Sequence, residues 1–336
     1  MGFSTPFTGY EQNFSNANER LSMLTVFSKV IVIFAIVAVG FFCKRKGILT
    51  DAVEGPLVDL LLLVTCPLMV LSSLASRTLE PGTLPKTLMV LGISMGYFII
   101  AMAVSFGLKG LLKNTPKEDL GVMMAIMTSL NSGFMGFPVT KAIFGDDMFF
   151  LIVIQNISLN IYFYSMAIIQ INYGHEESSN LKSALKSAIN PNIIAAFVGL
   201  IILFTQIKLP EPALEFTKML GDVTTPLSMI IVGMRLAKSN IMSIIKNRDL
   251  VLTSCISMFL MPCLVFLLVN WLPVPNDVKM IAVWASCFPC AVVVVTLAAK
   301  YKRNATLAAE GMALTTSMSL VLLPIAATIL SSIYGA

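Results

Sequence analysis

Two apolar stretches of the chain contain residues that interrupt a helix, and these residues have the clearest potential for chemistry. In the first stretch, Asn131, Gly136 and Pro138 lie within eight residues of one another; in the second, Pro289 stands mid-stretch beside Cys290. Glycine and proline weaken a helix, and the backbone groups that they free persist in lipid only beside a cavity or inside protein. We therefore predict a broken helix in each stretch.

The two predicted breaks lie at equivalent positions, because an offset of 159 residues places Cys290 on Asn131. Crossed, broken helices direct the N-termini of their half-helices at a common centre. Each N-terminus carries roughly half a positive charge, worth about 0.3–1 kcal/mol at a surface. The pattern predicts an anion site that needs no buried Lys or Arg. The alternative is a pair of proline kinks that serve packing alone.

Amide side chains follow the first break. Gln155, Asn156 and Asn160 fall in the next apolar stretch. Some should face the break, and others should bond neighbouring helices at about 0.6 kcal/mol each. The predicted substrate-binding residues are Asn131, Gly136, Pro138, Gln155, Asn156, Pro289 and Cys290.

Ionisable residues inside apolar stretches are costly and are functional candidates by default. Asp222 and Glu310 could carry a coupling proton, and Arg235 is a third candidate. The alternatives stay open: Arg235 could snorkel to the interface, and Glu310 could face the charged loop 300–303.

The cysteines do not indicate a disulfide framework or a metal site. All six lie in apolar segments, as small hydrophobic residues do. Cys287 and Cys290 have the spacing of a redox or metal motif, but no second cysteine pair or histidine is near them. His175, the single histidine, lies in a loop. We expect no catalytic residues, no metal and no cofactor, and an intramembrane enzyme ranks last among the function classes.

Composition predicts the elements that hold these residues. The chain of 336 residues is 57% hydrophobic and only 12% charged, against about 25% charged residues in soluble domains. Apolar stretches of about 20 residues span the hydrocarbon core as helices. The ten predicted spans are 23–43, 54–76, 87–112, 118–144, 147–173, 191–208, 213–237, 249–272, 277–299 and 305–333.

The distribution of Lys and Arg predicts the orientation. Fourteen lie in or near the loops after spans 1, 3, 5, 7 and 9, against six on the other side, so the first side should be cytoplasmic and both termini outside. The net charge of +5 is thus interpreted as loop orientation and not as nucleic-acid binding. The expected organisation is a flexible extracellular tail (1–22), a first five-helix repeat (23–173), a cytoplasmic loop (174–190) and a second repeat (191–336).

An internal repeat supports this division. The segment 61–68 aligns with 220–227, with Thr65 on Thr224 and Pro67 on Pro226, again at an offset of 159. Five spans per repeat is an odd number, so the second repeat must cross the membrane in the opposite sense. Inverted repeats are typical of transporters, with the substrate site near the midplane. The alternative is that apolar segments align by chance.

Small residues also occur in span 3. Gly92 and Gly96 are four residues apart, a spacing that indicates a face for close helix packing.

The chain resembles the auxin efflux carrier family, which includes plant PIN carriers and many bacterial members. The resemblance covers residues 23–333 and rests first on Asn131, Met135, Gly136 and Pro138, which are similar to the crossover motif of the family. Further similar segments are 190–192, 224–233, 288–289 and 298–301. The long hydrophilic loop of many plant PIN proteins is absent, so the resemblance is to the bacterial type.

The resemblance implies an all-α membrane protein of ten helices in two inverted five-helix repeats, with crossed broken helices 4 and 9, as in bile-acid symporters and NhaA-like proteins. Spans 1, 2, 6 and 7 would form a scaffold, and spans 3–5 and 8–10 a moving transport domain. It implies an elevator-like motion and organic anions as substrates. Asn131, Pro138 and Pro289 carry over as crossover residues, and Gln155 more loosely.

We therefore expect a secondary transporter that moves a small organic carboxylate across the plasma membrane, as a uniporter or coupled to protons. Its expected partners are the anion and the lipid bilayer, with a homodimer left open. Two alternatives remain: a sodium-coupled organic-anion symporter of the bile-acid type, and a receptor or interaction protein with the same fold that does not transport.

Overall fold

The computed structural model describes residues 28–175, 190–238 and 240–335, and within these ranges every regular element is a helix. The expected tail 1–22 and most of the expected loop 174–190 lie outside the described residues. A helix over residues 28–45 comes first. The elements of the first half that follow are α2 (Asp51–Leu60), η1 (Leu61–Thr65), α3 (Cys66–Ala75), α4 (Thr83–Leu108), η2 (Lys109–Leu111), α5 (Leu120–Thr128), η3 (Ser132–Gly136), α6 (Phe137–Phe163) and α7 (Met166–Ile171).

The second half is built in the same way from helices and short helical turns. Its elements are α9 (Pro191–Thr205), α10 (Glu211–Asp222), α11 (Thr224–Lys238), α12 (Ile241–Ile244), α13 (Arg248–Cys255), η4 (Ile256–Leu260), α14 (Met261–Asn270), α15 (Asn276–Ser286), α16 (Val292–Lys300) and α17 (Ala305–Tyr334).

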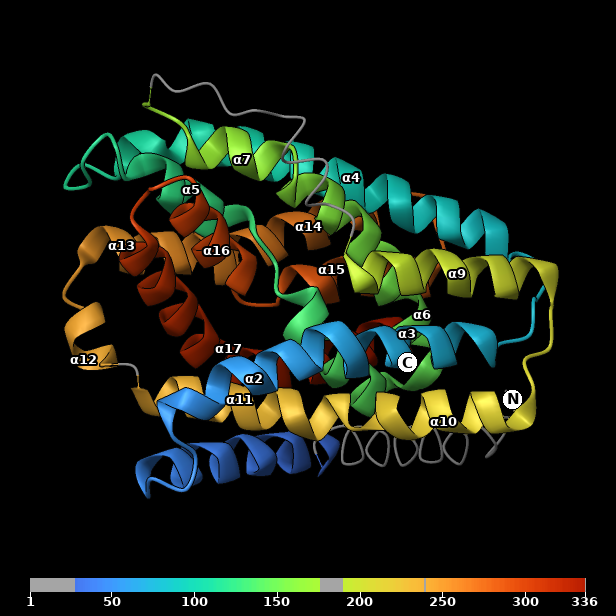
Figure 1. The fold of residues 1–336 in the computed structure, drawn as a ribbon. Coiled ribbons are helices and arrows are strands. Elements are labelled where there is room, and N and C mark those ends of the chain that lie inside the picture. The colour runs from blue at the N-terminus through green and yellow to red at the C-terminus, as the bar shows by residue number, and fades with distance from the viewer. Residues whose placement is uncertain (1–27, 176–189, 239, 336) are drawn as a thin grey trace, which may run out of the picture.

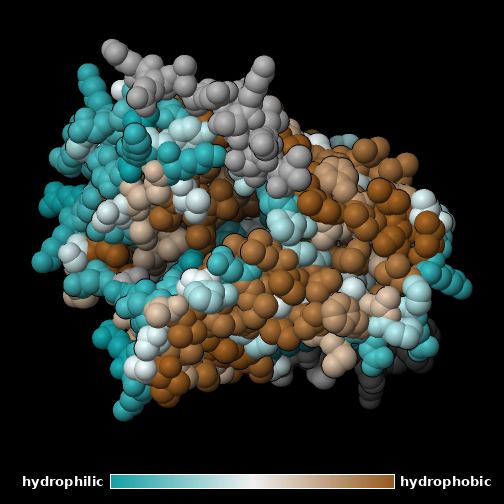
Figure 2. Space-filling model, viewed as in Figure 1, coloured by the Kyte–Doolittle hydropathy of each residue, from teal (hydrophilic) through white to brown (hydrophobic). Residues whose placement is uncertain are grey.

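Five helical stretches among the described residues are long and apolar enough to cross a membrane: 51–75, 83–111, 211–238, 248–270 and 305–334. Large hydrophobic side chains are exposed along them, and Figure 2 shows a broad apolar surface between two hydrophilic ends. Outside lipid such a surface would be costly. The structure therefore confirms an α-helical, multi-pass membrane protein.

The remaining expected spans are shorter or interrupted. α9 has 15 residues, and the stretches expected at 118–144 and 277–299 are each divided into two helices. α6 bends at Gly145, whose φ of 81° and ψ of −165° are not helical. This bend falls between the expected spans 118–144 and 147–173.

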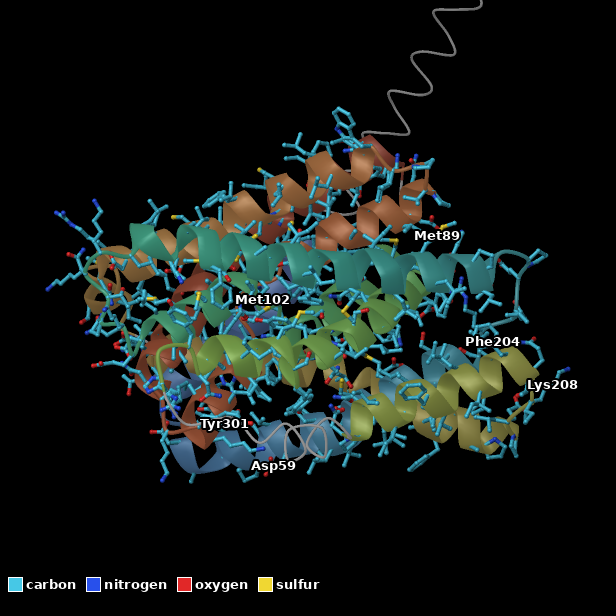
Figure 3. All side chains as sticks on the ribbon, turned by 90° about the horizontal axis from the view of Figure 1, so that it is seen from above. Asp59, Met89, Met102, Phe204, Lys208 and Tyr301 are labelled. Carbon is cyan, nitrogen blue, oxygen red and sulfur yellow. The ribbon has the colours of Figure 1, made fainter. Side chains whose placement is uncertain are left out.

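The helices run alongside one another, and most loops gather at two ends (Figure 1). Figure 3 places Lys208, after α9, and Tyr301, after α16, toward opposite ends of the molecule. This arrangement agrees with the expectation that the loops containing these two residues lie on opposite sides of the membrane.

The contacts define two helix groups. In the smaller group, α3 packs on α9 and α10, α2 packs on α11, and α11 also meets the helix 28–45. In the larger group, α4 packs on α6, α5 on α7 and α13, α14 on α15, and α16 on α17. α6 also contacts α3, α9 and α11, so it lies between the groups.

Glycines hold the smaller group together. A side chain at Gly40 would collide with the backbone of Ile230 in α11, and one at Gly233 would collide with the helix 28–45. A side chain at Gly199 would collide with Leu74 in α3. Small residues let helix backbones approach closely in a membrane, so these glycines fix two tight helix pairs.

Gly92 and Gly96 behave differently. A Cβ atom at either position would meet nothing within 4 Å. Both residues line an apolar groove between α4 and α14. The prediction of a close-packing face at these two glycines is therefore wrong within the chain, because helix spacing alone does not say which neighbour, if any, lies opposite.

Candidate functional site

The first predicted break is present. α5 ends at Thr128, and Ser129 is extended, with φ −78° and ψ 146°. Asn131 has φ −94° and ψ 50°, and helical structure resumes at Ser132. Pro138 then lies at the second residue of α6, directly after the π-helical turn η3, which is an irregular stretch where a residue without an N–H is tolerated.

The second predicted break is also present. α15 ends at Ser286, and α16 begins at Val292. Ala291, the residue before α16, is extended, with φ −75° and ψ 145°. Residues 287–291 are therefore an unwound segment inside the stretch expected at 277–299.

The two unwound segments bond to each other. The Asn131 N–H donates to the Pro289 carbonyl at 2.8 Å. The Ser129 hydroxyl donates to Cys290 Sγ at 3.2 Å and accepts from the Ala291 N–H at 3.4 Å. Breaking a helix frees backbone groups that need partners when buried, and each break supplies partners for the other.

A cavity of about 270 Å³ adjoins both segments. Its walls include the N-terminal turns of both half-helices, through Asn131 and Gly133 on one side and Ala291, Val292 and Val293 on the other. The other lining residues are Leu62, Leu63, Leu130, Phe134, Asn156, Leu159, Asn160, Phe163, Tyr164, Asn190, Pro191, Asn192 and Thr296. The cavity is thus apolar with a few polar groups, as small-molecule sites are.

A chain of amides runs along this cavity. Asn190 Nδ2 donates to Asn160 Oδ1 at 2.9 Å, and Asn160 Nδ2 donates to Asn156 Oδ1 at 2.9 Å. Asn156 Nδ2 in turn donates to the Ser132 hydroxyl at 3.3 Å. Asn190 also caps α9 by accepting from the Ile193 N–H at 3.0 Å. The chain links the first break to the start of α9.

The predicted binding residues divide into two sets. Asn131 and Asn156 line the cavity. The other five do not line this cavity. Three of them support the breaks: Pro289 and Cys290 through the bonds above, and Gly136 because a Cβ there would stand 3.0 Å from the Phe288 ring. Gln155 is buried, and its Oε1 has no partner among the described residues.

Two of the three ionisable candidates lie away from this cavity. Asp222 is half exposed and pairs with Lys141 at 3.3 Å. Glu310 is partly buried in the second turn of α17 and is not among the residues that line the cavity. A role for either in coupling stays a prediction.

The third candidate, Arg235, lies next to Asn131. Both residues line a narrow second cavity, together with Phe134 and Val292, which also line the larger one. Arg235 Nε donates to Glu54 Oε1 at 3.0 Å, and its guanidinium lies over the Phe134 ring, 5.3 Å from the ring centre. The Arg235 side chain is 20% exposed, and its role stays a prediction.

Several residues that line the larger cavity are absent from the predicted site. Asn190 and Asn192 were matched only as part of a family-like segment, and the buried Oδ1 of Asn192 has no partner among the described residues. No feature of the sequence marks Phe134 or Thr296 as a residue that lines the cavity. The Asn–Pro–Asn sequence, with a proline that favours a helix start, was the available sign that a third helix N-terminus lies here.

The helical fold and its exposed apolar surface define a multi-pass membrane protein, and a cavity lies beside its two interrupted helices. A model of the family described as membrane transport protein matches residues 25–327. The chain therefore belongs to this family, that of the auxin efflux carriers, as its motifs indicated.

A relative agrees with this assignment. The chain is 24% identical over 308 residues to an uncharacterized transporter of Methanocaldococcus jannaschii, covering 88% of this chain and 95% of the relative. The protein is thus a membrane transporter, and its family is one of transporters and not of enzymes.

Proposed function

We propose that the protein is a secondary transporter that moves a small organic carboxylate across the plasma membrane through the cavity between the two unwound segments. One observation carries the proposal: the N-terminal turns of two half-helices from different parts of the chain line the same cavity. Helix N-termini favour anions through their N–H groups and dipoles. A third helix, α9, begins at the same cavity with Pro191.

The chemistry of the lining suits a carboxylate with an apolar body. Asn131 and Asn156 offer amide donors, and Leu62, Phe134 and Val292 offer apolar contacts. A volume of about 270 Å³ has room for a molecule of a few carbon atoms with some water. Proton coupling and uniport are both compatible with this site.

Symmetric contacts favour the inverted repeat. At the offset of 159, Asn156 corresponds to Thr315. Asn156 bonds Ser132 at the first break, and Thr315 accepts from the Cys290 N–H at the second, at 3.1 Å. Gly40 and Gly199 have the same offset, and each is a close-packing point in the smaller helix group. Two halves with opposite orientations account for both correspondences.

An elevator mechanism fits the two helix groups. In this proposal the smaller group is the scaffold and the larger group moves with both breaks. Polar links between the groups include Arg77 to Asp147 at 2.8 Å, Lys141 to Asp222 at 3.3 Å, and Lys29 to the Ile143 carbonyl at 3.0 Å. The Asn190–Asn160 bond described above also joins them. Surface pairs of this kind are individually weak, so they can break and reform as the groups slide.

The cavity would open to the cytoplasm. Its lining includes 190–192, next to the loop whose lysines predict the cytoplasmic side. The termini would then lie outside. A homodimer stays a prediction, because the proposed site is formed within one chain.

The experiment is uptake of labelled malate into proteoliposomes, comparing the wild type with Asn131→Ala. We expect the variant to lose about tenfold or more of the initial rate, because a polar contact to a charged group contributes about 1.5–3 kcal/mol. Asn270→Ala is the matched control, since Asn270 is exposed, bonds Phe266 and Tyr334, and does not line the cavity.

An unchanged rate in Asn131→Ala would contradict the assignment of the substrate site to this cavity. If the wild type transports neither malate nor malonate, the proposal of a small organic carboxylate as substrate is wrong. Imposed sodium and pH gradients, applied one at a time, distinguish a sodium symporter, a proton-coupled carrier and a uniporter.

A further inference from the structure

We infer that Arg235 is the residue that receives the substrate's carboxylate, and that Glu54 occupies it as an internal substitute while the site is empty. The inference rests on the proposed function, because it names the group that recognises the anion. The structure contributes three observations: the position of Arg235, the identity of its partner, and the charge around it.

Arg235 is positioned to serve the transport cavity. It comes from α11, in the smaller helix group, and shares a narrow cavity with Asn131, Phe134 and Val292. These last three residues also line the larger cavity. The guanidinium lies over the Phe134 ring, 5.3 Å from its centre, and Phe134 lines both cavities. A ligand held at Asn131 would therefore contact both helix groups if its carboxylate reached Arg235.

The partner of Arg235 is itself a carboxylate. Glu54 Oε1 accepts from Arg235 Nε at 3.0 Å, and Glu54 Oε2 accepts from Lys238 at 2.8 Å. The Glu54 side chain is only 16% exposed. Arginine suits planar recognition of carboxylates, and a second carboxylate arriving from the cavity would compete with Glu54 for the same group.

The size of the narrow cavity beside Arg235 explains why the substrate's carboxylate must displace Glu54. Its volume of about 20 Å³ is room for about one water molecule, which is too little for a carboxylate. Glu54 must move away, or the Phe134 ring must turn, before the anion reaches the guanidinium. Glu54 can release Arg235 without becoming unpaired, because it keeps its bond to Lys238.

The charge of the surrounding cluster favours an incoming anion. Lys44, Arg235 and Lys238 pair with Asp51 and Glu54, through Lys44–Asp51 at 2.7 Å and Lys238–Asp51 at 2.5 Å in addition to the bonds above. These five groups carry one more positive than negative charge, so an anion balances the cluster. Such a field raises the local concentration of an oppositely charged substrate.

A structural ion pair and a substitute carboxylate predict different outcomes. If the pair only holds α2 to α11, then Arg235→Gln and Glu54→Gln should both weaken the protein and lower transport. If Glu54 competes with substrate, the two changes should shift KM in opposite directions. This difference in sign is the measurement.

The experiment is concentration-dependent uptake of labelled malate in proteoliposomes, with malonate as a second probe. We expect Arg235→Gln to raise KM by about ten- to a hundredfold, because it removes a charge-assisted contact, with a smaller change in the maximal rate. Arg235→Lys should recover part of the affinity, since it keeps the charge but loses the planar donor pair. Glu54→Gln should lower KM.

Two further variants control for charge and folding. Lys44→Gln removes one positive charge from the same cluster, but Lys44 contacts Asp51 and lines neither cavity. Only the field of the cluster should weaken, so KM should rise by about threefold at most, well below the effect of Arg235→Gln. The double variant Arg235→Gln/Glu54→Gln removes both members of the pair, and Lys238 keeps its contact with Asp51. It should fold as a monodisperse protein in detergent and keep the high KM of Arg235→Gln.

An unchanged KM in Arg235→Gln or in the double variant, or a raised KM in Glu54→Gln, would overturn the inference. If the wild type transports malate and Asn131→Ala impairs it while Arg235→Gln does not, this inference fails and the proposed function stands. If the wild type transports neither probe, the proposed function fails first.

Discussion

The two unwound segments occupy equivalent places in the chain but differ in chemistry. The first, at 129–131, presents the side chain of its own Asn131 to the cavity, and Asn156 from α6 lines the cavity beside it. Of the second, at 287–291, only the apolar Ala291 lines the cavity, and the Cys290 side chain is fully buried against Ser129. One break thus presents the polar groups, and the other holds it in place.

The difference shows how two structurally equivalent breaks can bind a single ligand. A symmetric pair of breaks gives two helix N-termini, and their dipoles act alike on an anion. Side chains need not be symmetric, because a single small ligand has only one orientation at a time. We therefore expect substitutions at corresponding positions to differ in kind, with affinity lost at the first break and stability lost at the second.

The largest contrast is expected between Asn131→Asp and Cys290→Ser, the corresponding positions. Asp is close to Asn in shape but adds a negative charge to a site proposed to bind anions. Two unit charges 4 Å apart repel by about 4 kcal/mol near a protein surface. Malate uptake in proteoliposomes should therefore fall by at least about a hundredfold, whereas Cys290→Ser should stay within about threefold because its side chain does not line the cavity.

Equal losses in the two variants would contradict the division of roles. A rate for Asn131→Asp above about a tenth of the wild-type rate would contradict anion binding at Asn131. Size-exclusion chromatography and melting temperature establish that both proteins are folded before the rates are compared.

The next contrast lies within α6. Asn156 lines the cavity, whereas Ser158, two residues later, donates to the Leu91 carbonyl in α4. Asn156→Ala should raise the KM for malate by about tenfold, which corresponds to about 1.4 kcal/mol. Ser158→Ala should leave KM unchanged and lower the melting temperature instead. If both variants change KM equally, Asn156 acts only through helix packing.

Much of the fold could be predicted because lipid imposes a simple rule. A long apolar stretch must satisfy its backbone internally, so it forms a helix, and proline marks where that helix is irregular. The π-helical turn η1 precedes Pro67, and the junction of α10 and α11 at Val223 precedes Pro226, at the repeated motif. The prediction for Gly92 and Gly96 failed because a residue's neighbour on another helix is not encoded in local spacing.

The site was predictable only in part. Asn131 and the two breaks were found because glycine and proline are rare inside apolar spans and leave a local signal. Arg235 was found as an ionisable residue, but its contact with Glu54 joins positions 181 residues apart. Asn190 and Asn192 stand at the end of a polar loop, where asparagine is common. Which face of a helix meets a cavity depends on packing between distant elements, so these residues needed the structure.

The smallest contrast in transport concerns Thr315, which corresponds to Asn156. Its hydroxyl accepts from the Cys290 N–H at 3.1 Å, and both residues are fully buried. Thr315→Val preserves the shape of the side chain but leaves that N–H without its acceptor, at a cost of about 1–3 kcal/mol in the free energy of unfolding. We expect a lower melting temperature in detergent and a KM for malate within about twofold of the wild-type value.

The matched control is Thr328→Val in the same helix. The Thr328 hydroxyl donates to the Pro324 carbonyl within α17, so its loss leaves no distant group without an acceptor and should change the melting temperature by less than half as much. A Thr315→Val protein that melts like the control would show that the Cys290 N–H finds another acceptor. A Thr315→Val protein with the KM of Asn156→Ala would show instead that both breaks bind the ligand through side chains, and the asymmetry between them would then be lost.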